Sequence, residues 1–328
     1  YIGFTNTNMS RKIIFMGDSA QLPPVNSPSS LALDKKELSK FSLSLDETEM
    51  IDVVRHREES GILSNATVLR KQIAQKDYYK IKINTQFSDI VPINHGEIED
   101  KYFDCLDIGK EEKPIIITYT NKSVQRYNNV IRNHIFPEKI EIQPDDDDSG
   151  KIEIQPGDDF IVIRNNYKHS VMNGEFGKVV KIHSDTEEKS IRFETKEGTK
   201  IVKLSFRDIT VRVEDMSGNP IQFNCKIIET LLESKYGNLT SEQQRALYVF
   251  FRMRVKEQGI EPKTPEFKEA IKTDPYFNAL LIKYGYAITC HKAQGGEWKN
   301  CIIDFCATPS IFSESYFRWC YTALTRCK

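Results

Sequence analysis

Short apolar runs recur along the chain, each beside a polar or glycine-containing segment. The clearest are Ile13–Met16, Ile115–Ile117 and the group Ile302, Ile303 and Phe305. Continuous apolar runs of this length are typical of strands that are covered on both faces of a parallel sheet. The pattern therefore predicts an α/β fold.

Helical periodicity lies between these runs. Four apolar residues recur at a spacing that places them on one face of a helix, namely Ile62, Ala66, Leu69 and Ile73. A second helix is predicted after a central strand over 113–122, and its members are Val124, Tyr127, Asn128, Val130 and Ile131. The segment Leu38–Leu45 predicts one further strand.

The middle of the chain changes to a period of two. Four β-rich segments lie at 160–164, 177–182, 190–194 and 209–213, with a tight turn at Asn173–Gly177. They predict a small β-barrel inserted into the α/β fold. Phe160, Tyr167 and Phe176 suit stacking on nucleobases, but packing inside the barrel is the favoured role for at least two of them.

The composition turns helical between Cys225 and Tyr284. Two apolar stripes are visible, one at Ile227, Ile228, Leu231 and Leu232, the other at Leu247, Phe250, Phe251 and Val255. Thr240–Gln243 predicts a capping box at the start of the second of these helices. We assign this helical insertion no function.

Charge and cysteine usage narrow the classes of protein. The 328 residues include 46 Lys and Arg against 47 Asp and Glu, a formal net charge of −1, which excludes a uniformly basic nucleic-acid binder but allows a local basic groove. Seven cysteines without a Cys-x-x-Cys pair predict reduced thiols in a cytoplasmic protein, with neither a metal site nor a disulfide framework. No apolar run reaches about 18 residues, so we expect no membrane partner.

A dense polar loop stands before the last apolar run. Thr289, His291, Lys292 and Gln294 lie within six residues, and Gly295–Gly296 permit a tight turn. A polar loop beside a buried strand is how α/β proteins place working residues at a sheet edge. On its own such a segment is more often an ordinary solvated loop, so its meaning depends on two other segments.

Those two segments complete a pattern in fixed order. Gly-Asp-x-x-Gln-Leu-Pro-Pro-Val occupies 17–25, Thr-x-His-Lys-x-Gln-Gly-x-Glu occupies 289–297, and Tyr-Thr-Ala-x-Thr-Arg occupies 321–326. Together they resemble motifs III, V and VI of superfamily 1 helicases, most closely the RecD-like and Dda-like branch. The resemblance implies a RecA-like parallel sheet carrying an inserted barrel of the Src-homology-3 (SH3) type. It also implies ATP and Mg²⁺ between two RecA-like domains, and 5′ to 3′ movement on DNA.

The resemblance assigns nucleotide chemistry to four residues. Gln21 would sense the γ-phosphate through its side-chain amide, and Asp18 would order the water shell of magnesium. Gly295 and Glu297 would contact the nucleotide, with Glu297 accepting a hydrogen bond from the ribose hydroxyl.

Two arginines are implied to complete the phosphate site when the cleft closes. Arg326 ends the last motif, and Arg55 follows an apolar strand in a segment that resembles motif IV. A fork-shaped guanidinium suits a phosphate. For each residue the alternative is a surface arginine, and Arg57 competes with Arg55 for the role.

A second set of residues is implied to hold the backbone of single-stranded DNA, including the strand at a junction with duplex. It comprises Thr120, Asn121, Asn128, Thr289, His291 and Lys292. Backbone contacts give little sequence preference and a strong dependence on salt. The alternatives left open are a helix cap by Asn121, an interior position for His291 and plain solvent exposure of Lys292.

The chain lacks the loop that cradles nucleotide phosphates. No Gly-x-x-x-x-Gly-Lys followed by Ser or Thr is present, and no acidic pair precedes Ile13. We therefore expect the C-terminal part of a helicase that does not hydrolyse ATP alone. The expected divisions are a remnant of the first RecA-like domain (1–48), the second RecA-like domain (49–146 and 285–328), the barrel (147–215) and the helical insertion (216–284).

Three hypotheses for function follow. The leading one is a RecD-like, ATP-dependent DNA helicase with a role in DNA repair. The second is a Pif-family or RNA-directed superfamily 1 helicase. The third is a non-catalytic nucleic-acid-binding module derived from a helicase, which the presence of Gln21, Arg55 and Arg326 disfavours because a pure binder has no use for them.

Overall fold

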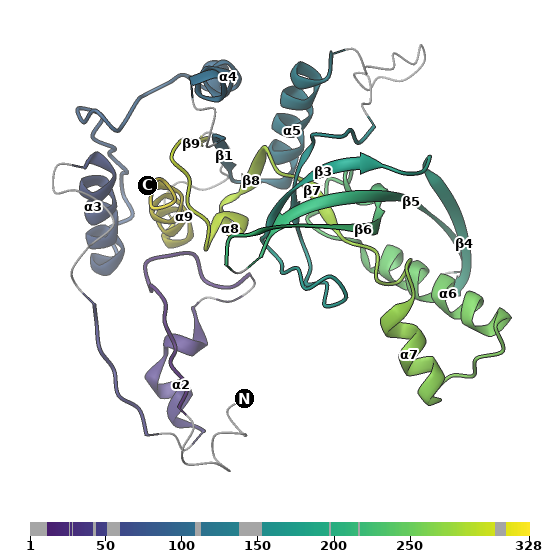
Figure 1. Ribbon diagram of the computed structural model, residues 1–328. Coiled ribbons are helices and arrows are strands. Elements are labelled where there is room, and N and C mark those ends of the chain that lie inside the picture. Colours follow the sequence, from purple (N-terminus) through teal and green to yellow (C-terminus); the bar gives the residue numbers. More distant parts are fainter. Residues whose placement is uncertain are drawn as a thin grey trace.

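The computed structural model describes most of the chain (Figure 1). The described residues are 12–25, 27, 29–41, 44–50, 60–108, 113–137, 153–196, 198–215, 217–305 and 313–328. Arg55 and its competitor Arg57 lie outside these ranges.

A three-stranded parallel sheet forms one half of the fold. The strand β1 (Ile115–Thr118) lies in the middle, paired on one side with β8 (Ala287–Thr289) and on the other with β9 (Cys301–Ile303). All four β1 residues are buried, as expected for a central parallel strand. The predicted strands at 113–122 and near 302 are therefore confirmed.

Helices surround this sheet and the chain that leads to it. They are α3 (Gly61–Gln75), α4 (Ile98–Ile108), α5 (Asn121–Ile135), the single turn α8 (Cys290–Ala293) and α9 (Glu314–Leu324). The helix α3 packs on α9, and α5 packs on β1 and β8. Ile62, Ala66, Leu69 and Ile73 are buried, so the predicted helical face of α3 is confirmed. No helix in the described ranges is both long and apolar enough to cross a membrane.

The second half of the fold is an antiparallel sheet, seen to the right of β8 in Figure 1. Its strands are β2 (Asp159–Val162), β3 (Phe176–Ile182), β4 (Glu187–Thr195), β5 (Gly198–Glu214), β6 (Pro220–Ile228) and β7 (Ile282–Tyr284). The long β5 pairs with β4 through its first half and with β3 and β6 through its second half. The four β-rich segments are thus confirmed as antiparallel strands.

The ends of this sheet meet around a closed path. β2 pairs with both β3 and β7. The chain entering β7 also bonds to the end of β6, since Leu280 N donates to Lys226 O at 2.7 Å and Ile228 N donates to Leu280 O at 3.4 Å. Hydrogen-bonded neighbours therefore follow one another from β2 through β3, β5, β6 and β7 back to β2. We refer to these five strands as the strand ring.

The prediction of helix from residue 216 onward is wrong at its start. Residues 220–228 form β6, which runs antiparallel to β5. The signal was present, because Ile221, Phe223, Cys225 and Ile227 alternate with polar residues at a period of two. The first predicted apolar stripe is not a helix, because Ile227 and Ile228 end β6 and Leu231 lies in the short turn η4 (Glu229–Leu231). The second stripe is confirmed as part of α6 (Ser241–Glu257), which opens with the predicted capping box of Thr240 and Gln243, and α7 (Pro265–Thr273) follows it.

Two N-terminal strand predictions are also wrong. Residues 12–18 have no regular structure, and the side chains of Ile14 and Met16 are each 82% exposed. The predicted strand Leu38–Leu45 begins inside the helix α2 (Lys35–Ser39), which the Asp34 carboxylate caps by accepting from two backbone amides. Residues 40–41 then form a turn, 44–45 have no regular structure, and 42–43 lie outside the described residues. The remaining short turns are η1 (Leu31–Leu33), η2 (His95–Glu97) and η4 (Glu229–Leu231).

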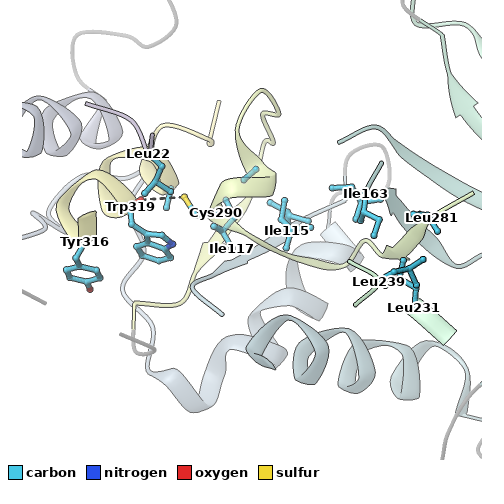
Figure 2. Packing of buried hydrophobic residues seen from close by; sticks show 14 of the residues in the cluster. Leu22, Ile115, Ile117, Ile163, Leu231, Leu239, Leu281, Cys290, Tyr316 and Trp319 are labelled. Atoms are coloured by element: carbon cyan, nitrogen blue, oxygen red, sulfur yellow. Dashed lines mark hydrogen bonds between the residues drawn. The ribbon is translucent and has the colours of Figure 1, made fainter. Parts of the chain in front are cut away.

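One hydrophobic cluster crosses both halves. Figure 2 shows side chains from Trp319 on α9 past Cys290 and Ile117 to Ile163 and Leu281 beside the strand ring. Burial of apolar area is the main favourable term in folding, so the parallel sheet and the strand ring are held together by a shared core.

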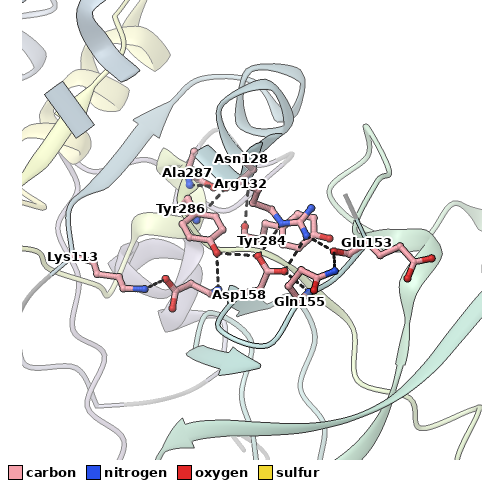
Figure 3. Close-up of polar contacts among 10 residues, drawn as sticks. Lys113, Asn128, Arg132, Glu153, Gln155, Asp158, Tyr284, Tyr286 and Ala287 are labelled. Carbon is pink, nitrogen blue, oxygen red and sulfur yellow. Dashed lines mark hydrogen bonds and ion pairs between the residues drawn. The ribbon is translucent and has the colours of Figure 1, made fainter. Parts of the chain in front are cut away.

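A buried polar network joins the same two halves (Figure 3). The Arg132 guanidinium of α5 donates to both carboxylate oxygens of Asp158, at 2.8 and 3.0 Å. The Tyr286 hydroxyl donates to Asp158 at 2.9 Å, and Arg132 lies 3.8 Å above the Tyr284 ring. Burial and the neighbouring carboxylates raise the pKa of Tyr286 above its usual range, so its hydroxyl stays a neutral donor.

Breaking this pair should destabilise the protein strongly. Arg132→Met leaves the buried Asp158 carboxylate without its counter-charge, which costs about 3–5 kcal/mol in the free energy of unfolding, measurable by urea denaturation. The matched control is Arg126→Met on the same helix, because Arg126 is 49% exposed and pairs with Glu99 at the surface, a contact that contributes at most about 1 kcal/mol. Equal losses would contradict the role of the buried pair.

Candidate functional site

The three motif segments meet at Leu22. Its backbone N–H donates to the Thr322 hydroxyl of α9 at 2.9 Å, and its carbonyl accepts from the Gln294 amide at 2.8 Å. Leu22 and Ala20 are buried. Residues 272 and 300 positions apart in sequence are thereby fixed against one another.

Asp18 anchors the same loop. Its carboxylate accepts from the Tyr321 hydroxyl at 2.6 Å, from Arg70 of α3 at 2.7 Å and from the Ala20 N–H at 3.0 Å. Both oxygens are therefore engaged within the protein. These contacts give Asp18 a role in docking the loop onto α9 and α3, and its role toward magnesium stays a prediction.

Gln21 stands between these anchors and is half-buried. Its backbone carbonyl accepts a 3.4 Å hydrogen bond from Arg318, and the neighbouring Ser19 carbonyl accepts a 2.5 Å hydrogen bond from the same guanidinium. Among the described residues no hydrogen bond is made by the Gln21 side-chain amide. The backbone at Gln21 is thus held in place, while the hydrogen-bonding groups of its side-chain amide are available to a ligand. A phosphate sensor needs both properties.

Arg326 is not a surface arginine. Its side chain is 5% exposed and lies just beyond the end of α9. The guanidinium donates to the carbonyls of Thr322 and Gly296, at 3.1 and 3.3 Å, and to the Thr325 hydroxyl at 3.1 Å. This places the predicted finger directly beside the glycine turn of the 289–297 segment.

The glycine turn has the predicted form. Gly295 adopts a φ of +88°, in the left-handed region that favours glycine. Glu297 is exposed, with its carboxylate 3.9 Å from the Lys328 ammonium. The contact of Gly295 and Glu297 with a nucleotide stays a prediction.

Removal of the Thr322 hydroxyl should loosen the N-terminal loop. Thr322→Val leaves the buried Leu22 N–H without its acceptor, at a cost of about 1–3 kcal/mol, and should increase hydrogen exchange at the Leu22 amide. The control is Thr67→Val on α3, whose hydroxyl bonds only its own helix at the surface. Unchanged exchange at Leu22 would contradict the docking of the loop onto α9.

Five of the six residues predicted to hold a nucleic-acid strand end or follow β1 and β8, at the carboxyl edge of the parallel sheet. Thr118 of β1 is in register with Thr289 of β8, so the segments that follow these strands emerge side by side. Thr120 caps α5 by accepting from the Ser123 N–H at 3.0 Å. The cap is therefore Thr120, and Asn121 is exposed.

Asn128 does not belong to this edge. Its side chain is 3% exposed, donates to the carbonyls of Tyr284 and Ala287, and accepts from the backbone N–H groups of Tyr286 and Ala287. Every hydrogen-bonding group of the amide is used to hold α5 against the entry to β8. The predicted contact of Asn128 with nucleic acid is thus replaced by a structural role.

His291 and Lys292 face outward from α8. His291 is exposed, which excludes the alternative of an interior histidine, and partial desolvation lowers its pKa. The Lys292 ammonium donates to the Asn173 side chain at 3.0 Å, and Asn173 is in the tight turn before β3. Lys292 is therefore placed between the parallel sheet and the strand ring.

Lys283 is a functional candidate that the sequence analysis missed. It lies on β7, is half-buried and donates to the Ser234 carbonyl. Desolvation lowers the pKa of Lys283 to about 8, with a contribution from the nearby positive charge of Lys292, while Glu233 opposes the shift. No motif contains Lys283, and only the folded chain brings the two lysines near one another.

Comparison with known proteins gives a match at the C-terminal end. Residues 284–328 match the model of the UvrD-like helicase C-terminal domain. An uncharacterized protein of Acanthamoeba polyphaga mimivirus is 25% identical over 325 residues, an alignment that covers 89% of this chain and 62% of that protein.

Two solved structures align over most of the chain. Pif1 helicase from Bacteroides in complex with ADP-AlF3 and ssDNA gives a TM-score of 0.41 at 14% identity, covering 95% of this chain and 59% of that one. Pif1 helicase from Candida albicans gives 0.40 at 15% identity, covering 95% and 60%. The chain thus spans about three fifths of the length of these relatives. Its C-terminal segment is similar to the C-terminal domain of UvrD-like helicases.

Proposed function

We propose that the full-length protein is an ATP-dependent helicase that moves along single-stranded DNA and separates duplex at junctions. The observation that carries this proposal is the convergence of Gln21, Gln294 and Arg326 around one buried turn of α9. An uncommitted amide and a guanidinium next to a glycine turn are suitable donors to a γ-phosphate.

The fit to ATP and Mg²⁺ is partial. The described residues supply donors for the outer phosphate, while the sequence holds no phosphate-cradling loop and Asp18 is engaged by Tyr321 and Arg70. Bound ATP would supply the free energy for movement. This chain's residues would sense its terminal phosphate, and we assign none of them to magnesium.

The branch within superfamily 1 follows from the same motifs. The segments at 17–25 and 289–297 resemble those of RecD-like helicases, which would move 5′ to 3′ on DNA. The comparisons are equally compatible with a Pif-family helicase. In either case we propose that the strand ring is the SH3-like barrel of the family. Strand polarity, measured on duplexes with a 5′ or 3′ single-stranded tail, tests the direction.

The central experiment is ATP turnover by the full-length protein with and without single-stranded DNA. Turnover that rises with added strand supports a motor. Strand binding without turnover would support the alternative of a helicase-derived binding module, and turnover with RNA alone would support an RNA-directed enzyme.

Arg326 provides the first specific prediction. In the full-length protein, Arg326→Ala should abolish ATP turnover while the affinity for single-stranded DNA changes only a few fold, because the guanidinium serves the phosphate and not the strand. Because Arg326 is buried, circular dichroism must confirm folding, and Arg326→Lys retains the charge without the fork. The control is Arg252→Ala, an exposed arginine of α6. Lost binding with intact turnover would contradict the assignment.

Lys283 provides a prediction for pH. We propose that Lys283 and Lys292 attract strand phosphates together with Thr120, Asn121, Thr289 and His291. Because the pKa of Lys283 is lowered to about 8, its charge is present at pH 7 and lost above pH 8. Affinity for single-stranded DNA should therefore fall between pH 7 and 9, and Lys283→Arg, whose charge persists, should flatten the fall. Identical pH profiles would remove Lys283 from the site.

A further inference from the structure

The loop between β2 and β3 presents one aromatic ring to solvent. Tyr167 is 79% exposed, whereas the other two aromatic residues considered for base stacking are occupied. Phe160 is fully buried, and Phe176 packs edge-on against Trp298 with ring centroids 5.7 Å apart. Of the three, Tyr167 is the exposed ring, while Phe160 is buried and Phe176 is half-buried.

The loop that carries Tyr167 is held in place on both sides. Asn166 and Val171 exchange two backbone hydrogen bonds of 2.8 and 3.1 Å, and the Asn166 side chain donates to the Asn278 carbonyl at 2.9 Å. His169 stacks on Phe223 of β6, with ring centroids 4.5 Å apart and an angle of 10°. The ring of Tyr167 is thus displayed on a braced loop, which reduces the ordering cost of binding.

A hydrogen-bonded path connects this ring to the residues proposed to hold the strand. Lys292 donates to the Asn173 side chain at 3.0 Å, the Asn173 N–H donates to the Asn165 side chain at 2.9 Å, and the Asn165 amide donates to the Tyr167 hydroxyl at 3.4 Å. Lys292 and the exposed ring of Tyr167 are therefore linked through two intervening residues, Asn173 and Asn165.

The charges around the ring suit a nucleic acid. Arg164 and Lys168 flank Tyr167 in sequence and are both exposed. Glu175, in the turn that follows, is the acidic residue of this stretch and is half-buried. An exposed aromatic ring beside basic side chains is the combination by which proteins bind single strands without reading sequence.

We propose that Tyr167 is a stacking platform for a nucleobase of the single strand whose phosphates lie at Lys292. This inference rests on the proposed function, since it requires that the protein bind single-stranded DNA. It adds a base contact on the strand ring to the backbone contacts on the parallel sheet.

The test compares two oligonucleotides of equal length and charge, a thymidine oligomer and its abasic counterpart, by fluorescence anisotropy with the full-length protein. Tyr167→Ala should weaken binding of the thymidine oligomer about 5- to 10-fold and leave binding of the abasic oligomer unchanged. Tyr167→Phe, which keeps the ring, should behave as the wild type. Tyr79→Ala is the matched control, because Tyr79 is 81% exposed beyond the end of α3.

The outcomes separate this inference from the proposed function. If the wild type binds both oligomers and Tyr167→Ala binds them equally well, the stacking role is overturned while the helicase proposal stands. Equal losses on both oligomers would likewise overturn stacking, because the effect would not depend on bases. If the wild type binds neither oligomer, the proposed function itself is overturned, and the inference with it.

Discussion

The ion pair between Arg132 and Asp158 fixes the geometry on which the remainder depends. Arg132 belongs to the helix that follows the central strand of the parallel sheet, and Asp158 precedes the first strand of the ring. Both side chains are at most 2% exposed, so the pair is stable only while its hydrogen bonds are complete. Tyr286 and the backbone of residues 153–155 complete them. These contacts hold α5 of the parallel sheet against the start of the strand ring.

That position determines where the outward-facing residues gather. β7 and β8 are separated only by Gly285 and Tyr286, so the strand ring and the parallel sheet are joined at their closest approach. Lys283 lies on one side of this joint and Lys292 on the other. The Asn128 side chain of α5 makes four hydrogen bonds to the backbone of residues 284–287 at this junction. Asn128, which the sequence analysis predicted to contact nucleic acid, therefore stabilises the junction between β7 and β8.

Sequence reasoning succeeded where a pattern is local and failed where a tertiary partner decides. The buried face of α3, the central strand and the capping box at Thr240 follow from spacing alone. Ile13–Met16 reads as a buried strand because its residues are apolar, yet no described strand pairs with it, and Ile14 is exposed. Asp18 carries the chemistry of a magnesium-site residue, and only the fold shows that Tyr321 and Arg70 occupy it. Lys283 belongs to no motif, so no spacing rule could find it.

The contacts of Gln294 link the two proposed activities. Its amide holds the Leu22 carbonyl, next to Gln21, and its backbone directly follows the helical turn that carries His291 and Lys292. Thr322 holds the other side of Leu22 and accepts from Arg326 through its carbonyl. A shift of Gln21 or Arg326 toward a phosphate must therefore move Leu22, Gln294 or α9, because these groups share buried hydrogen bonds that are costly to leave unmade. In the proposed motor, the strand contacts His291 and Lys292 on α8 lie three and two residues before Gln294, whose amide holds the loop that carries Gln21.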